Sequence, residues 1–321
     1  MTASAQLLLN IARPWDQHDP VDTARQARAA SFDGVGLADS PRLFPDAVLE
    51  TERVLAGTDA ALAGPCVLGL GLHHPAAVAQ SIRTLARHHP GRVFTVVGRG
   101  ESSVRNEGLP VPGFADYAAS LDLLGRLLPE DERATCTLLG AASGPRTITG
   151  TARRLAGVLI DAGADPMVVE RAVSLAREAH PDTDCWLFLR VVTTTTPQQA
   201  EAAADPVLGS CAARMVRAPD WFAVPTDARA AVARIAAAHD YLRHGEAGAR
   251  GMHVDAAAEA LVRDRFLITG TAEQVAARLR PLAALGLGGL VLAGAVAGLT
   301  ERLPEVATAV RAGLGTAEAP R

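Results

Sequence analysis

Short apolar runs alternate along this chain with longer segments in which alanine and leucine recur at helical spacing. Apolar runs bounded by glycine, proline or polar residues are typical of buried strands, and the longer segments are typical of amphipathic helices. Eight strand and helix pairs follow one another, which predicts an α/β fold, the (β/α)8 TIM barrel. An open doubly wound sheet is the alternative, but the first strand is not followed by the GxGxxG turn that a dinucleotide site needs.

The expected elements follow from these patterns. The strands are expected at residues 6–11, 34–38, 66–70, 93–98, 135–141, 157–160, 185–192 and 289–293. The helices are expected at residues 20–30, 46–61, 76–88, 114–128, 145–154, 166–180, 272–285 and 303–314. Between the seventh strand and the following barrel helix, helical patterns at 227–242 and 254–262 predict an insertion over about residues 200–265. The prediction is one domain spanning residues 1–321.

Composition excludes several classes of function. The net charge of −4 and the lack of a basic stripe argue against a nucleic-acid partner. No apolar run is long enough for a membrane span and the start lacks a basic signal region, so a cytoplasmic protein without a membrane partner is expected. Lysine is absent, which excludes a Schiff-base lysine. The four scattered cysteines have no metal-ligand spacing, and no metal site is predicted.

Two carboxylates stand where expected strands end, at the edge of a parallel barrel where active sites lie. Glu101 follows Gly98 and Gly100, whose missing side chains would let backbone approach a flat ring. Spacing alone equally fits an ordinary turn with a solvated glutamate. Asp39, followed by Ser40, ends the second strand and on sequence alone is equally a helix cap or turn residue.

Two further strand ends are candidates for a cofactor site. Gly69, Leu70, Gly71 and Leu72 end the third strand, where glycines indicate either a bulge or tight packing. The other is the turn of Ala141, Ala142, Ser143 and Gly144 before Pro145, with Thr147 in the first helical turn; a helix start of this kind attracts anions. Adjacent His73 and His74 point in different directions on any regular element, so a shared metal is not expected.

Four segments, in the same order, resemble the bacterial luciferase-like superfamily. They are FDGVGLADS from Phe32, HHPAAVAQSIRTL with HPGRVFTVVGRGES from His73, GAASGPR from Gly140 and FLITGTAEQVAARL from Phe266. The pattern is most similar to the coenzyme F420-dependent branch, which includes glucose-6-phosphate dehydrogenases and methylenetetrahydromethanopterin reductases. Ser40 replaces the histidine that often follows the family's aspartate, and the tryptophan of the sugar-phosphate enzymes is missing, so glucose 6-phosphate is not the expected substrate.

The resemblance implies roles for the candidate residues. Glu101 would exchange a proton with the substrate, its pKa raised beside an apolar ring, and Asp39 would lie near the hydride-accepting carbon. A cis peptide at Gly71 and Leu72 would brace the ring, and His74 would stand at the cofactor entrance. The residues expected to bind the cofactor are Ser40, Gly69, Leu70, Gly71, Leu72, His74, Gly98, Gly100, Ala141, Ala142, Ser143, Gly144 and Thr147. Of these, Ala141, Ala142, Ser143, Gly144 and Thr147 would hold the cofactor's phosphate.

The resulting hypothesis is an F420H2-dependent reductase that transfers hydride to a small organic acceptor, an imine, enamine or conjugated alkene, in actinobacterial secondary metabolism. The alternatives are an FMN-dependent monooxygenase of the same fold and a flavin-binding protein without turnover. The resemblance also implies a homodimer. Neither the substrate nor the direction of hydride transfer follows from these residues.

Overall fold

The nine strands of the described chain run parallel, and eight of them close into a barrel. The computed structural model describes residues 5–12, 19–246, 248–249, 251 and 255–315. The strands are β1 Gln6–Ile11, β2 Gly34–Leu37, β3 Leu62–Gly69, β4 Val93–Gly98, β5 Cys136–Ala142, β6 Gly157–Ile160, β7 Asp184–Thr193, β8 Leu267–Gly270 and β9 Gly289–Ala293. Because β1 pairs with both β2 and β9, and β7 with both β6 and β9, the ring is complete and the predicted TIM barrel is confirmed.

The short strand β8 was not expected from the sequence. It pairs with the last four residues of the ten-residue β7, while the first part of β7 pairs with β6 and β9. Only Leu267 and Ile268 of β8 are apolar and buried, which is too short a run to predict a strand by itself. The strand forms because the C-terminal part of the long strand β7 offers its backbone for pairing with β8.

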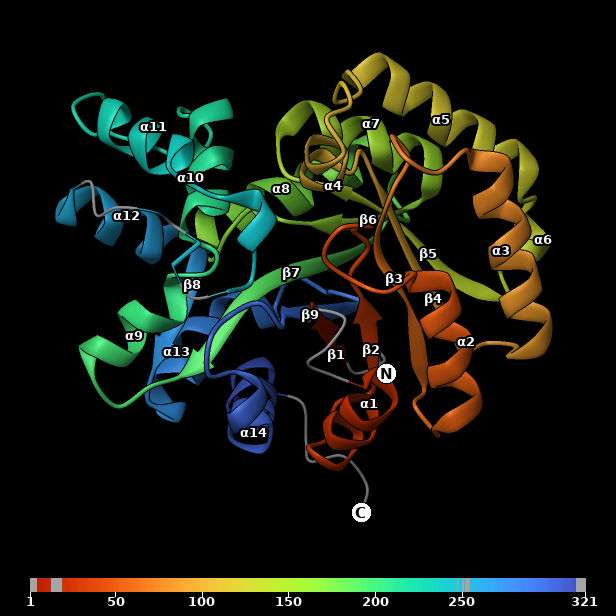
Figure 1. Ribbon diagram of the computed structural model, residues 1–321, viewed down its shortest axis with the longest axis horizontal. Helices are drawn as coiled ribbons and strands as arrows, with labels where there is room; N and C mark the ends of the chain where they lie inside the picture. Colours follow the sequence, from red (N-terminus) through yellow and green to blue (C-terminus); the bar gives the residue numbers. More distant parts are fainter. Residues whose placement is uncertain (1–4, 13–18, 247, 250, 252–254, 316–321) are drawn as a thin grey trace.

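Helices surround the barrel, and most begin where predicted (Figure 1). They are α1 Pro20–Ala29, α2 Ala47–Gly57, α3 Pro75–His88, α4 Glu101–Asn106, α5 Phe114–Leu127, α6 Glu130–Arg133, α7 Pro145–Leu155, α8 Pro166–Ala179, α9 Pro197–Ala204, α10 Leu208–Arg217, α11 Arg229–Ala237, η1 Tyr241–Arg243, α12 Ala256–Phe266, α13 Ala272–Ala283, η2 Thr300–Arg302 and α14 Leu303–Leu314. Proline in the first turn suits a helix start because its missing N–H would have no intrahelical acceptor there. Asp19 and Asp165 cap α1 and α8 just before such prolines.

Large side chains fill the barrel interior below the strand ends. Trp186 and Phe94 are fully buried and their ring centroids lie 5.2 Å apart. A Cβ at Gly289 would lie 2.4 Å from the Trp186 ring, so β9 needs a glycine at the point where it passes the indole. Side chains thus fill this part of the barrel interior, as is usual for the fold.

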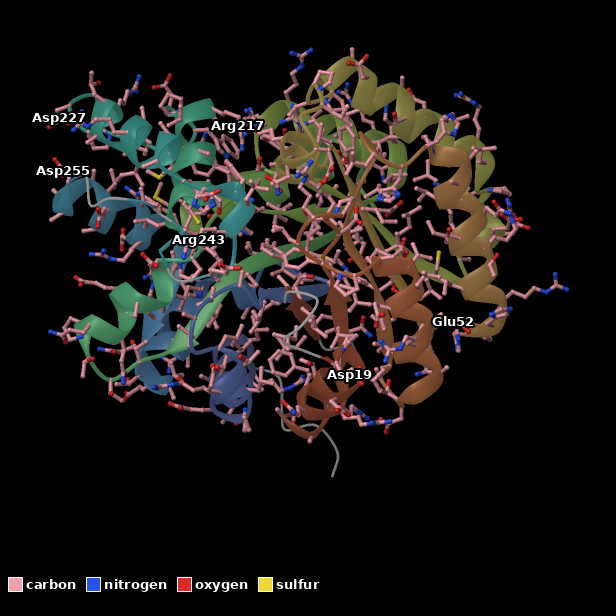
Figure 2. All side chains as sticks on the ribbon, in the orientation of Figure 1. Asp19, Glu52, Arg217, Asp227, Arg243 and Asp255 are labelled. Carbon is pink, nitrogen blue, oxygen red and sulfur yellow. The ribbon has the colours of Figure 1, made fainter. Side chains whose placement is uncertain are left out.

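The insertion carries α9 to α12 and η1, and its helices gather on one side of the barrel (Figure 1). The patterns at 227–242 and 254–262 correspond to α11, η1 and α12, with residues 252–254 outside the described part. Arg217 lies on the side of the insertion nearest the barrel, whereas Asp227 and Asp255 lie at its outer edge (Figure 2). In the described part of the chain, no helix is both long and apolar enough to cross a membrane.

Candidate active site

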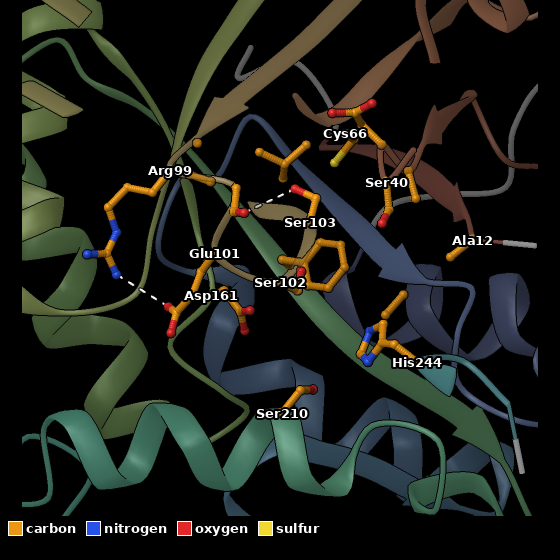
Figure 3. Close-up of a pocket in the computed structure, with 18 of the residues that line it drawn as sticks. Ala12, Ser40, Cys66, Arg99, Glu101, Ser102, Ser103, Asp161, Ser210 and His244 are labelled. Atoms are coloured by element: carbon orange, nitrogen blue, oxygen red, sulfur yellow. Dashed lines mark hydrogen bonds and ion pairs between the residues drawn. The ribbon is translucent and has the colours of Figure 1, made fainter. Parts of the chain in front are cut away.

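A cavity of about 290 Å3 lies at the carboxyl ends of the strands. Its apolar lining includes Val67, Leu159 and Phe188, and its polar lining includes Asn10 and Ser40. Figure 3 shows Ser40 and Cys66 on one side and Glu101, Asp161 and Ser210 on the other. Enzymes with this fold use the same end of the barrel, because the loops that follow the strands converge there.

The structure brings together most of the predicted site residues. Those that line the cavity are Asp39, Ser40, Gly98, Gly100, Glu101, Ala141, Ala142, Ser143 and Thr147. They come from the ends of β2, β4 and β5 and from the helices that follow β4 and β5. The rule that parallel strands present their carboxyl ends at one edge of the sheet predicted this convergence correctly.

Gly69, Leu70, Gly71 and Leu72 do not line the cavity. A Cβ at Gly69 would lie 2.9 Å from the Gly100 Cα, and one at Gly71 would lie 2.7 Å from the Val104 side chain. The two glycines therefore let the loop after β3 pack against the start of α4, which is the tight-packing alternative rather than approach to a cofactor.

The cis peptide of the third strand joins Cys66 and Val67, not Gly71 and Leu72. At this point the register between β3 and β4 shifts, and both residues of the bond line the cavity. The expected position was wrong because the irregular backbone lies inside β3, whereas the backbone N–H of Leu72 donates to the Gly69 carbonyl in a turn beyond the strand.

His74 and Gly144 also lie outside the cavity lining. The Nδ1 of His74 accepts a hydrogen bond of 3.2 Å from the backbone N–H of Ala76, so this residue caps α3. Gly144 is the residue before α7, and its N–H donates to the Thr147 hydroxyl, which in turn donates to the Gly144 carbonyl. Because the Thr147 proton is used in this cap, the helix start offers backbone N–H groups rather than that hydroxyl to an anion.

Glu101 is the first residue of α4, preceded by Gly100 in a left-handed conformation with φ of 72°. Its carboxylate pairs with Arg99 at 3.4 Å and with Arg105 at 3.3 Å, and also with Arg217 of α10. In the protein itself, the Glu101 carboxylate is therefore surrounded by three guanidinium groups. Its role as a proton donor stays a prediction.

Asp39 pairs with a histidine from a different loop. The Nε2 of His73 lies 2.9 Å from Asp39 Oδ2, and the Asp39 side chain is only 6% exposed. The hydrogen bond to Asp39 raises the pKa of His73 above its usual value, despite partial burial, and the charges of Asp39 and Asp46 act in the same direction. His73 thus stands beside the aspartate, while Ser40 follows it in sequence.

A buried charge cluster occupies the opposite side of the cavity. Arg190 of β7 binds Asp161 through two hydrogen bonds of 2.8 and 3.1 Å, and Arg214 of α10 lies 2.5 Å from the same carboxylate. Burial alone would raise the pKa of Asp161, but the two arginines outweigh it and lower the pKa to about 2. The cluster joins the barrel to the insertion.

The insertion contributes Tyr241 and His244 to the cavity lining. The side-chain amide of Asn106, on α4, donates to the Tyr241 carbonyl at 3.2 Å, and His244 lies 3.1 Å from His239 between ring nitrogens. Burial, followed by the neighbouring His239, lowers the pKa of His244 to about 3, so its imidazole is neutral at physiological pH.

The sequence analysis missed Asp161, Arg190, Arg214 and His73 as site residues. One signal was present in the sequence, since Arg190 interrupts an apolar run predicted as a buried strand. A charged residue in such a run requires a partner, which here is Asp161 at the end of β6. The partnership between His73 and Asp39 has no comparable signal, because it depends on where the loop after β3 turns.

The N-terminal part of the chain matches a known protein family. Residues 10–128 match the family described as luciferase-like monooxygenase, and the resemblance identified in the sequence is confirmed. No curated protein matches the chain.

Solved structures share the fold over nearly the whole length. The coenzyme F420-dependent tetrahydromethanopterin reductase from Methanopyrus kandleri is 15% identical, with a TM-score of 0.70 over 96% of this chain and 99% of that one. An F420-dependent secondary alcohol dehydrogenase, solved with an F420-acetone adduct, is 16% identical, with a TM-score of 0.70 over 97% and 99%. The EDTA monooxygenase from Chelativorans sp. BNC1 is 14% identical, with a TM-score of 0.62 over 97% and 98%. At these identities the likeness shows the fold.

Proposed function

We propose that this protein is a luciferase-like oxidoreductase that binds reduced coenzyme F420 in the cavity and reduces a small organic acceptor, an imine, enamine or conjugated alkene. The observation that carries the proposal is the cavity itself, which combines an apolar lining, unpartnered polar atoms and charged groups at the carboxyl end of the barrel. Two structural neighbours are F420-dependent enzymes, which supports the choice of cofactor. A homodimer and a cytoplasmic location stay predictions.

The cavity residues fit a flat heteroaromatic ring with polar edges. The Oδ1 of Asn10 and the Oγ of Ser40 are buried and have no hydrogen-bond partner among the described residues, although both side chains line the cavity. Buried polar atoms of this kind require a partner, and a ring carrying carbonyl and N–H groups would supply one. Val67 and Phe188 would contact the ring faces, and the turn of Ala141 to Ser143 would hold a phosphate.

Reduced F420 would supply the hydride when bound. The chain would orient the acceptor, exclude water and handle one proton. Asp39 lines the cavity and its partner His73 is more exposed, so the pair connects the cavity to the surface. In this proposal a proton passes from His73 through Asp39 Oδ2 at the cavity wall to the acceptor that receives the hydride, while the Glu101 carboxylate positions Arg99 and Arg217.

A second candidate function is an FMN-dependent monooxygenase. The matching family is described as luciferase-like monooxygenase, and the neighbours include a type II Baeyer-Villiger monooxygenase in complex with FMN. A binding protein without turnover would use the same cavity and would lack only the catalysis.

Titration of the purified protein with F420 and separately with FMN tests the proposal. We expect F420 fluorescence to change at micromolar protein, and Ala141→Leu, which narrows the cavity, to weaken binding at least about tenfold, or 1.4 kcal/mol. Ala119→Leu on the exposed face of α5 is the matched control and should bind normally. Tight FMN binding with no response to F420 would favour the monooxygenase, and binding of neither would refute both.

A further inference from the structure

Positive charge is in excess on one side of the cavity. Arg99, Arg190, Arg214 and Arg217 all line it. Each acid on this side is shared, because Asp161 pairs with Arg190 and Arg214, and Glu101 pairs with Arg99 and Arg217. Four lining arginines thus face two carboxylates. Of the lining residues that the structure describes, the remaining acid is Asp39, which pairs with His73.

The excess charge is poorly solvated. The Arg190 side chain is 3% exposed, and its Nε has no hydrogen-bond partner among the described residues. Arg214 is three-quarters buried, and its Nη1 donates to the Ser210 carbonyl at 2.7 Å. Burying an uncompensated cation is costly, so a net positive cluster of this kind requires an anion.

The arginines also repel one another. The pKa of Arg217 is lowered, first by its burial and then by the charges of Arg214 and Arg99, even though Glu101 acts in the opposite direction. A further negative charge placed between these groups would relieve the repulsion. Arg214 and Arg217 stand one turn apart on α10, so one group bound inside the cavity can reach both.

We propose that this arginine side, formed by Arg190, Arg214 and Arg217, binds an oxyanion of a ligand in the cavity. The inference rests on the proposed function in taking that ligand to be the acceptor or the cofactor. A carboxylate on the acceptor fits best, because guanidinium groups bind carboxylates in a planar, two-point arrangement. The cofactor's phosphate tail has the same chemistry and is the second source. Since Arg190 belongs to the barrel and Arg214 and Arg217 belong to the insertion, the anion would also hold the barrel and the insertion together.

The test measures anion binding by the full-length protein without cofactor. Acetate and inorganic phosphate are titrated separately at constant ionic strength with chloride as the balancing salt, and the thermal midpoint is recorded. We expect a concentration-dependent rise for wild type, because a ligand that binds only the folded state stabilises it. In Arg214→Gln and in the more exposed Arg217→Gln, the apparent Kd should rise at least about tenfold.

Arg229→Gln is the matched control. Arg229 lies on α11 of the same insertion and pairs with the exposed Asp220, so its loss removes one charge without altering the cavity lining. It should respond to both anions as wild type does. No response beyond that to chloride in wild type, or an equal loss in the control, would overturn the proposal. If Arg214→Gln fails to fold, Arg217→Gln and Arg214→Lys provide the same comparison, the lysine keeping charge but losing the two-point geometry.

F420 binding separates the two sources of the oxyanion. If the oxyanion belongs to the acceptor, Arg217→Gln should bind F420 as tightly as wild type while losing its response to acetate. If the oxyanion belongs to the cofactor, Arg217→Gln should bind F420 at least about tenfold more weakly than wild type. The deazaflavin chromophore without its phosphate tail should then bind wild type and variant equally. Anion binding with no affinity for F420 or FMN would refute the proposed function and leave the anion site standing.

Discussion

The two sides of the cavity hold carboxylates in opposite electrostatic surroundings. On one side Asp39 accepts a hydrogen bond from the Gly69 N–H and pairs with one titratable side chain, His73, whose pKa the hydrogen bond to Asp39 raises above its usual value. On the other side Asp161 and Glu101 are surrounded by arginines, which stay protonated at all physiological pH values. His73 and Asp39 can exchange a proton, whereas the arginines of the other side keep a constant positive charge. We therefore propose that the Asp39 side handles the proton and that the arginine side binds the anion.

The largest expected effect concerns the stability of the arginine side. Asp161→Asn leaves Arg190 buried without a counter-charge, and breaking a buried pair in this way costs about 3 to 5 kcal/mol of unfolding free energy. Denaturant unfolding measures the loss. Asp220→Asn removes an exposed carboxylate that pairs with Arg229, and its stability should match wild type within error. Equal losses in both variants would contradict the assignment of Asp161.

The next effect separates the two candidate acids. If Asp39 handles the proton, Asp39→Asn should lower turnover at least about 10²-fold with F420 binding little changed. Glu101→Gln should affect turnover less and should raise the KM of an anionic acceptor more, because Glu101 positions Arg99 and Arg217. Steady-state kinetics of both variants with the same acceptor measure the change in turnover and the change in KM separately. The reverse pattern would restore Glu101 as the proton donor that the sequence analysis expected.

A smaller effect is the response of stability to acid. The pKa of His244 falls to about 3 in the folded protein, while an unfolded histidine titrates near about 6.5. Between these values the unfolded chain binds more protons, so the unfolding free energy falls as pH falls from about 6.5 toward 3. His244→Gln should flatten that part of the profile, measured by thermal unfolding at several pH values. A profile as steep as that of wild type would count against the buried neutral imidazole.

The smallest effect is expected at His73. Its pKa is raised in the folded state, so its pairing with Asp39 contributes fully below about pH 6.5 and the contribution is lost as pH rises through the raised pKa. The stability gap between wild type and His73→Gln should therefore narrow with increasing pH, the opposite trend to that of His244. A gap that stays constant from about pH 5 to 9 would show that the pair does not titrate.

Residues of the cavity could be predicted from the sequence only where they directly follow a predicted strand. Asp39, Glu101 and the turn of Ala141 to Ser143 immediately follow apolar runs, and the parallel topology gathers such positions at one edge. The glycines at 69 and 71 gave a misleading signal, because a glycine needed for close approach of two loops has the same sequence appearance as one needed beside a ligand.

The sequence by itself determined a parallel sheet covered by helices, because apolar runs that alternate with amphipathic segments are buried together in that arrangement. The count of eight pairs and the missing GxGxxG turn favoured the closed barrel over the open sheet. The sequence also determined which strand ends carry carboxylates. Only the tertiary structure decided their chemistry, since a carboxylate is a proton carrier or a fixed charge according to what surrounds it. The partners of Asp161 and Glu101 on α10, and the partner of Asp39 on the loop after β3, are distant in sequence and meet only when the insertion and the loops close over the barrel.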